Sequence, residues 1–142
     1  MYDPAFQIGN FTPEELIEGI SNAQILIGND YEIALIEDKL KISHEELIVM
    51  VPILITTLGS KGSIIEARND AMHIKPAKPK NTSDPTGAGD AFAAGFLFGR
   101  SLDLAPERSL RLGNRVAEEV LGVPGFGVDP ERMRRAVRTM LL

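Results

Sequence analysis

The stretch SDPTGAGDAFAAGF, residues 83–96, combines residue types that suit phosphate chemistry. A glycine-rich turn comes directly before an acid, Asp90, and small and apolar residues follow. A helix that starts at this turn presents unpaired N–H groups and the positive end of its dipole to an anion. A carboxylate beside an anion is repelled, unless it serves to take a proton from an attacking hydroxyl. The pattern therefore suggests phosphoryl transfer, with Asp90 as general base and the amides of Gly87, Ala88 and Gly89 as anion hole.

A structural alternative stays open for the same residues. Glycine-rich turns before helices are common, and Asp90 could simply cap the helix. The sequence contains neither a Walker A pattern nor a complete G-x-G-x-x-G pattern. The glycine turn alone does not decide between the two interpretations.

Composition bounds the class of protein. The chain has 142 residues, 44% of them hydrophobic, which is enough for a core of ordinary size. The net charge of −5 argues against non-specific binding to nucleic acid, and the lack of cysteine excludes thiolate chemistry. No apolar stretch reaches the roughly 18 residues of a membrane span, and the first ten residues lack the regions of a signal peptide. We therefore expect a cytoplasmic protein that binds small molecules, with neither nucleic acid nor a membrane as partner.

Hydrophobic periodicity and cap residues predict the elements that position this chemistry. Short apolar runs predict buried strands at 23–28 and 52–59, and residues 62–77 predict a hairpin that turns at Asn69–Asp70. Thr12 and Ser43 begin capping boxes, and Asp129 is the expected cap of the last helix. The predicted helices cover 12–20, 29–40, 44–51, 87–100, 105–122 and 130–142. The order of strands and helices predicts an α/β protein with a mostly parallel sheet, in which residues 1–142 form a single unit.

Two kinds of side chain are expected outside the site. Phe92, Phe96 and Phe98 should pack in the core beneath the helix that follows the glycine turn. The two histidines, His44 and His73, have no partner at metal-ligand spacing, and His73 falls in a predicted edge strand. We assign no site role to either histidine.

The segment DPTGAGDAFAAGF, residues 84–96, resembles the C-terminal signature of the ribokinase-like (PfkB) family of sugar and nucleoside kinases. The match is long and nearly complete. The resemblance implies a three-layer αβα fold, with Asp90 as catalytic base and Gly87 to Asp90 as the anion hole. It also implies ATP as phosphate donor and Mg²⁺ as cofactor.

Two segments that precede this signature follow the family's order. NDYE resembles its N-x-x-E motif, which implies that Asn29 and Glu32 help to place Mg²⁺ and phosphate. Because Mg²⁺ keeps several waters, Glu32 would act through water. TLGSKG resembles the nucleotide loop T-x-G-x-x-G, which implies ATP contacts from Thr57, Gly59, Ser60 and Gly62. Taken alone, Asn29 or Asp30 is also a good helix N-cap, and the glycines also suit a turn between strands.

The last matching segment is GNRVAEEVLGVPGFG, residues 113–127. Asn114 falls where an asparagine borders the adenine pocket in the family. Many members also bind a monovalent cation such as K⁺ near this loop, and the matching positions here are Asp84 and Thr86. The loop reads VPGFG, whereas a basic loop is often seen in the family.

The resemblance covers only the C-terminal half of the family. The Gly-Gly signature, the lid sheet and most acceptor contacts have no counterpart, so we expect a fragment or an internal start. We expect the partner to be either an N-terminal half or a second copy that forms a homodimer. The chain alone should be weakly active or inactive as a kinase.

The expected activity is ATP-dependent phosphorylation of a hydroxyl on a nucleoside or a sugar. The sequence resembles prokaryotic adenosine-kinase-like members in 29–39 and 51–65, which favours a nucleoside such as adenosine. The alternative is a non-catalytic nucleotide-binding half-domain or interaction module.

Overall fold

The computed structural model describes residues 1–76, 87–121 and 129–141. These residues divide into two units, Met1–His73 and Ile74–Leu142, and each is described by itself. That residues 1–142 act as a single domain stays a prediction.

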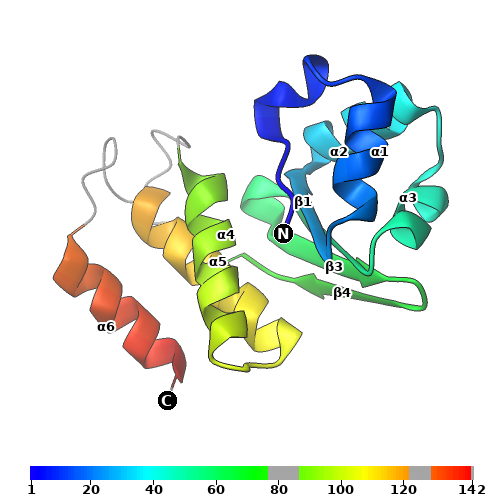
Figure 1. Cartoon of the computed structure of the whole chain (residues 1–142). Helices are drawn as coiled ribbons and strands as arrows, with labels where there is room; N and C mark the ends of the chain where they lie inside the picture. Colours follow the sequence, from blue (N-terminus) through cyan, green and yellow to red (C-terminus); the bar gives the residue numbers. More distant parts are fainter. Residues whose placement is uncertain (77–86, 122–128, 142) are drawn as a thin grey trace. The chain divides into compact units, whose positions relative to one another are not determined.

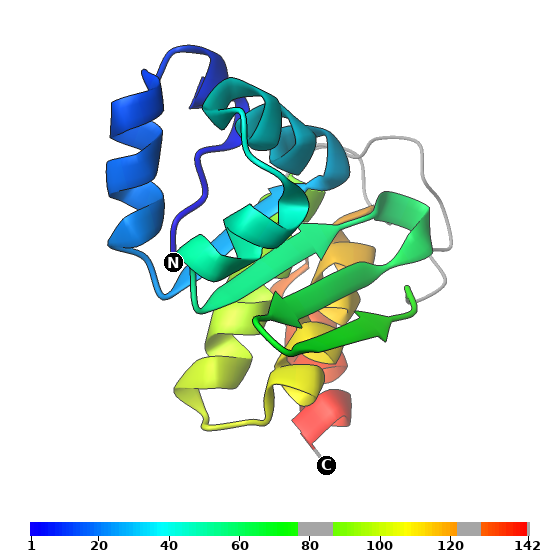
Figure 2. The same ribbon diagram turned by 90° about the vertical axis from the view of Figure 1, so that its right-hand side faces the viewer.

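The first unit contains a four-stranded sheet in the order β1–β2–β3–β4, seen from two sides in Figures 1 and 2. The parallel pair is β1 (Ile25–Asn29) and β2 (Ile53–Thr57). β3 (Ser63–Ala67) is antiparallel to β2, and β4 (Asp70–Ile74) follows after a two-residue turn. The α/β class and the hairpin are confirmed, but the turn lies at 68–69 and not at Asn69–Asp70, because Asp70 already starts β4. The described sheet is mixed, because β1 and β2 are parallel and β3 is antiparallel to β2.

The N-terminus lies beside β1. Tyr2 forms a one-residue parallel bridge with Leu26: its N–H donates to the Ile25 carbonyl (2.8 Å), and its carbonyl accepts from Ile27 (3.0 Å). A Cβ at Gly19 would lie 2.6 Å from the Tyr2 ring, so glycine is needed for this contact. Burial raises the pKa of the Tyr2 phenol, and the negative charge of Glu15 adds to the effect.

Three α-helices of the first unit start with the same device, a capping box. The N-cap side chain accepts a hydrogen bond from the third helical amide, and the third side chain accepts one from the N-cap amide. The boxes predicted at Thr12 and Ser43 are confirmed. A short 3-10 helix, η1 (Ala5–Gly9), was not predicted. The three capped helices are α1 (Pro13–Ser21), α2 (Asp30–Leu40) and α3 (His44–Met50).

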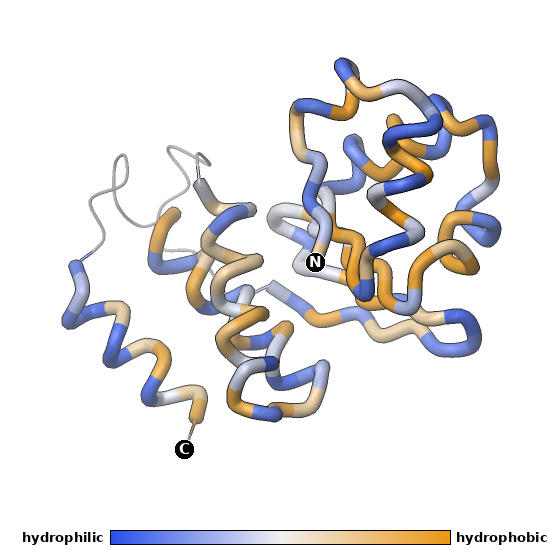
Figure 3. Tube along the Cα trace, viewed as in Figure 1, coloured by the Kyte–Doolittle hydropathy of each residue, from blue (hydrophilic) through white to orange (hydrophobic). Residues whose placement is uncertain are grey.

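A hydrophobic core joins these helices to the sheet. Leu26 and Leu54 are directly paired across β1 and β2, and both belong to one buried cluster with apolar residues of the helices. The helical members include Leu16, Ile36 and Leu47, each fully buried. Along the helices, hydrophobic and hydrophilic residues alternate (Figure 3), as expected where one face is buried. The core thus fixes the strand ends from which the candidate site starts.

The second unit is helical, with α4 (Ala88–Ser101), α5 (Pro106–Leu121) and α6 (Pro130–Leu141). Glycine lets α4 and α5 approach closely: a Cβ at Gly95 would lie 2.9 Å from both the Gly113 Cα and the Val116 side chain. The predicted cap of α6 is confirmed, because Asp129 Oδ1 accepts from the Glu131 amide at 2.9 Å.

Between α5 and α6 lies a buried acid. Glu119 is only 4% exposed, and its carboxylate pairs with Arg115 of α5 (2.7 Å) and with Arg132 of α6. Two arginines around one buried carboxylate offset the cost of removing that charge from water.

The prediction for Phe98 was wrong. Phe92 and Phe96 are buried as expected, whereas Phe98 is 45% exposed. Residues four apart share one face of a helix, but a residue two positions further lies on the other side. No helix in the described parts of the chain is long and apolar enough to cross a membrane.

Candidate functional site

The carboxyl ends of β1 and β2 carry the first group of expected site residues. These strands end at Asn29 and Thr57, which are paired directly in the parallel register. The Thr57 hydroxyl donates a long hydrogen bond, 3.5 Å, to the Gly28 carbonyl. In open sheets with parallel strands, ligands bind outside the carboxyl ends of those strands. The first unit therefore brings Asn29 and Thr57 together at an edge where a ligand can bind.

Glu32 is held in the capping box of α2. Its Oε2 accepts from the Asn29 amide, and Asn29 Oδ1 accepts from the Glu32 amide, both at 2.8 Å. Asn29 is thus the N-cap, and Asp30 is the first helical residue. The box leaves Glu32 Oε1 without a donor among the described residues. A water, or a hydrated cation, can occupy that position.

Gly28 was missed by the sequence analysis. A Cβ at this position would lie 3.3 Å from Glu32 Oε2 and 3.1 Å from the Ile33 side chain. Glycine therefore leaves room for the capping box at the end of β1. Its place one residue before an N-x-x-E pattern was the available signal.

The segment after β2 folds into a tight loop with a 3-10 turn, η2 (Gly59–Lys61). Gly59 has φ of 56° and Gly62 has φ of 97°, conformations that glycine adopts without strain. Backbone hydrogen bonds close the loop, among them the Leu58 amide to the Gly62 carbonyl at 2.8 Å. Ser60 is exposed at its tip. The two glycines expected to bring the backbone close to ATP are therefore required by the loop's own shape.

A second missed residue supports this loop from outside. His73 of β4 donates from Nε2 to the Lys61 carbonyl at 2.8 Å. The two residues are twelve positions apart, and they meet because β3 and β4 form a hairpin next to the loop. The predicted edge position of His73 is confirmed, since β4 is the last strand of the described sheet.

In the second unit, α4 begins without a side-chain cap. Its N-cap is Gly87, in the left-handed conformation with φ of 78°. Asp90 is the third helical residue and is exposed, and no described residue donates a hydrogen bond to its carboxylate. Apart from its own turn of the helix, no described residue lies within 4 Å of where a Cβ on Gly89 would be. Among the described residues, nothing crowds Gly89 at the start of α4 and nothing pairs with Asp90.

Asn114 lies on α5 and is half-buried. Its Nδ2 donates to the Lys75 carbonyl at 3.4 Å. It lines a small pocket of about 180 Å³ with Ile74, Lys75, Pro76, Arg111, Arg115 and Met140. This pocket belongs entirely to the second unit.

The expected site residues thus fall into two groups. Asn29, Glu32 and the loop residues lie in the first unit, and Gly87 to Asp90 and Asn114 lie in the second. Asp84 and Thr86, the expected cation ligands, lie outside the described residues, as does the segment 122–128. Their roles stay predictions, as do the catalytic and binding roles of the placed residues.

These features define an α/β protein whose candidate ligand residues collect at strand ends and at a helix start. Residues 2–132 match the pfkB family of carbohydrate kinases, and the chain belongs to this family. A nucleoside kinase of Methanocaldococcus jannaschii is 34% identical over 96 residues, which make up 68% of this chain and 32% of that protein. A cytidine kinase of Thermococcus kodakarensis is 30% identical over 125 residues, which make up 84% of this chain and 45% of that protein.

Solved structures agree with this assignment. A nucleoside kinase of Burkholderia thailandensis in complex with inosine matches with a TM-score of 0.89 at 28% identity, over 97% of this chain and 46% of that one. The nucleoside kinase of M. jannaschii, described as an archaeal member of the ribokinase family, matches with a TM-score of 0.87 at 28% identity, over 96% of this chain and 47% of that one. The expected ribokinase-like fold class is confirmed. The chain spans about a third to a half of the length of these relatives.

Proposed function

We propose that this chain carries the phosphoryl-transfer half of an ATP-dependent kinase that acts on a hydroxyl of a nucleoside. Asp90 accepts the hydroxyl proton while that oxygen attacks the γ-phosphorus of ATP, and ADP leaves with the electrons of the broken bond to the β–γ bridging oxygen. The amides of Gly87, Ala88 and Gly89 hold the charge that develops on the transferred group. Asn29, Thr57, Gly59, Ser60, Gly62 and Asn114 bind the nucleotide.

The start of α4 carries this proposal. An acid in the first turn of a helix is normally used as a cap or as a partner for the helix dipole. Among the described residues Asp90 has no hydrogen-bond partner, and none of them crowds the neighbouring Gly89. An exposed carboxylate at an anion-binding helix start is what a general base for phosphoryl transfer requires.

The residues at the end of β1 fit a magnesium ion. The side chains at this position offer oxygen ligands: the side-chain carbonyl Oδ1 of Asn29 and the carboxylate of Glu32. Because Glu32 Oε2 is held by the backbone, Glu32 would hold the hydrated ion through Oε1 and water. Bound there, Mg²⁺ would offset the negative charge of the ATP phosphates. A monovalent cation would be held by Asp84 and Thr86, as the family resemblance implies.

The relatives favour a nucleoside over a sugar as acceptor. Their names include a nucleoside kinase, a cytidine kinase and a guanosine-inosine kinase. A ribokinase of Bacillus subtilis is also similar, at 34% identity over 112 residues. Ribose is therefore the sugar against which the nucleosides are compared as acceptors. Adenosine, inosine, cytidine and ribose form the assay panel that decides the acceptor.

Nucleotide binding is the first test. Calorimetric titration of the 142-residue chain with ATP and Mg²⁺ should give one saturable site. Gly62→Val should weaken it at least about tenfold, because valine strains a backbone with positive φ. Gly9→Ala serves as control, since Gly9 has no neighbour within 4 Å and lies outside the site. A flat titration of the unmodified chain would overturn the proposal.

Turnover is the second test. Asp90→Asn should leave ATP binding in place and lower the transfer rate by about 10²- to 10⁴-fold, the usual contribution of a positioned base. The rate is measured with the substrate panel on the 142-residue chain and on any longer form of the protein that contains it. Near-normal turnover in Asp90→Asn would refute the base role.

A second candidate is a nucleotide-binding half-domain without its own catalysis. The chain spans about a third to a half of the length of these relatives, and the residues placed here do not account for an acceptor site. Both observations favour this candidate. We propose that the 142-residue chain alone is weakly active or inactive. ATP binding without turnover would support that, and robust phosphorylation of any panel member would contradict it.

A further inference from the structure

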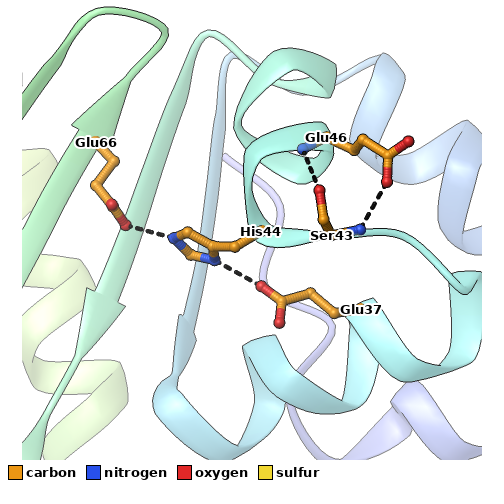
Figure 4. Close-up of polar contacts among 5 residues, drawn as sticks. All are labelled: Glu37, Ser43, His44, Glu46 and Glu66. Carbon is orange, nitrogen blue, oxygen red and sulfur yellow. Dashed lines mark hydrogen bonds and ion pairs between the residues drawn. The ribbon is translucent and has the colours of Figure 1, made fainter.

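The ring of His44 lies between two carboxylates from different parts of the first unit (Figure 4). Its Nδ1 is 2.6 Å from Glu37 Oε1, and its Nε2 is 3.1 Å from Glu66 Oε2. Glu37 belongs to α2, His44 is the first residue of α3, and Glu66 lies on β3. One imidazole thus joins three elements. Spacing along the chain did not reveal this contact, because Glu66 is 22 residues away and belongs to the hairpin.

The geometry sets the protonation state of the ring. An ionised carboxylate oxygen only accepts hydrogen bonds, and neutral imidazole has a single N–H. Both ring nitrogens face carboxylate oxygens, so both bonds form only when both nitrogens carry protons. Burial by itself lowers the pKa of His44, but the hydrogen bonds to Glu37 and Glu66 and their negative charges outweigh burial and raise it above its ordinary value.

The position of His44 within its own helix opposes a positive charge. It is the first residue of α3, where the helix dipole disfavours a cation. Acids of three elements compensate: Glu37 from α2 and Glu66 from β3 bond the ring, and Glu45 follows it in α3. The pKa of Glu45 is lowered by its own backbone amide and by the Ser43 hydroxyl, and the charge on His44 adds to the effect. Glu46 is held by the Ser43 capping box.

The connection before α3 adds one more charged pair. Lys41, with φ of 56°, ends α2 and pairs with Asp38 at 2.9 Å. Both side chains of that pair are more than 70% exposed, so water screens it strongly. By contrast the side chains of His44, Glu37 and Glu66 are 39%, 23% and 17% exposed. The Lys41–Asp38 pair stays within the end of α2, so of these two charged contacts only the less exposed His44 bridge joins α3 to other elements.

We propose that charged His44 is a pH-sensitive tie that fastens the start of α3 to α2 and β3. The tie holds while the imidazole carries both protons and is lost as the ring becomes neutral. Its contribution to the stability of the first unit is complete below the ordinary histidine pKa of about 6.5 and is lost as the pH rises through the raised value. The tie is independent of nucleotide binding and of the proposed transfer reaction.

Thermal unfolding of the 142-residue chain between pH 5.5 and 9 tests the tie. Glutamine in place of His44 can bond one glutamate but carries no charge. His44→Gln should lower Tm by about 3–5 °C at pH 5.5, a discounted value for half-exposed charged bonds in a unit of this size. The deficit should shrink to under about 1 °C by pH 9.

The second histidine supplies the matched control. Among the described residues the hydrogen-bond partner of His73 is a carbonyl, which accepts from Nε2–H in either charge state, and glutamine can replace that donor. His73→Gln should therefore change Tm by an amount that does not depend on pH. A His44→Gln deficit that is equally constant, or that grows toward pH 9, would overturn the proposal.

Two further measurements apply if His44→Gln does not fold. Glu66→Gln replaces one acceptor by a neutral amide and should show the same pH-dependent loss, at about half the size. In the unmodified chain, ¹⁵N NMR at pH 6.5 should find both ring nitrogens of His44 protonated. A neutral ring at that pH would refute the tie.

Discussion

The starts of α2 and α4 carry an acid at the same position, the third residue of the helix, but hold it in different ways. In α2 the carboxylate of Glu32 is bonded to the Asn29 amide, and Asn29 in turn caps the helix. In α4 the N-cap is Gly87, which has no side chain, and Asp90 has no bond to a described residue. Glu32 is explained by local structure alone, whereas Asp90 is not. An acid that no described residue binds is the better candidate for chemistry.

The two regions also differ in what positions the acid. α2 is fixed at its start by polar bonds and along its length by the apolar cluster beneath the sheet. α4 is fixed along its length, where glycine brings it against α5. The location of Asp90 should therefore depend on residues far along α4, and that of Glu32 on residues next to it.

The largest effect is expected at Gly95. Alanine there places a methyl group 2.9 Å from Gly113 Cα and from the Val116 side chain, so α4 and α5 must separate. We expect a loss of about 2 kcal/mol, since overpacking outweighs the better helix propensity of alanine. Thermal unfolding measures it, and hydrogen exchange of α4 and α5 amides locates it in the second unit.

Gly89→Ala is the matched control on the same helix. Its methyl group would meet no described atom within 4 Å, so stability should be unchanged or slightly higher. If Gly95→Ala were as mild as Gly89→Ala, close packing would not be what positions α4.

The middle effect is expected at Asn29. Alanine removes the oxygen that accepts from the Glu32 amide, and losing an N-cap side chain costs about 1 kcal/mol. Asn29→Asp keeps an acceptor and should cost much less. Urea unfolding of the two variants gives the difference, and equal losses would show that the cap bond is not what Asn29 contributes.

The sequence predicted the local devices well and the long-range ones poorly. The capping boxes at Thr12 and Ser43 were found because all of their atoms lie within four residues. The N-x-x-E pattern at 29–32 was assigned to magnesium, although it is also a capping box with asparagine in the first place. The contacts of His44 with Glu66 and of His73 with the Lys61 carbonyl depend on where a hairpin lies, so spacing along the chain did not reveal them. Phe98 was misplaced because an apolar helix conceals which of its faces is buried.

The smallest effect separates the two acids directly. Glu32→Ala removes the acceptor for the Asn29 amide and should cost about 0.5–1 kcal/mol of stability. Asp90→Ala removes only a favourable term with the helix dipole, which the helix propensity of alanine largely offsets, so the change should be under about 0.5 kcal/mol. Both are read from urea unfolding of the 142-residue chain. If Asp90→Ala lowers the free energy of unfolding as much as Glu32→Ala does, Asp90 stabilises the helix start as a cap. Its carboxylate would then not be free to act as a general base.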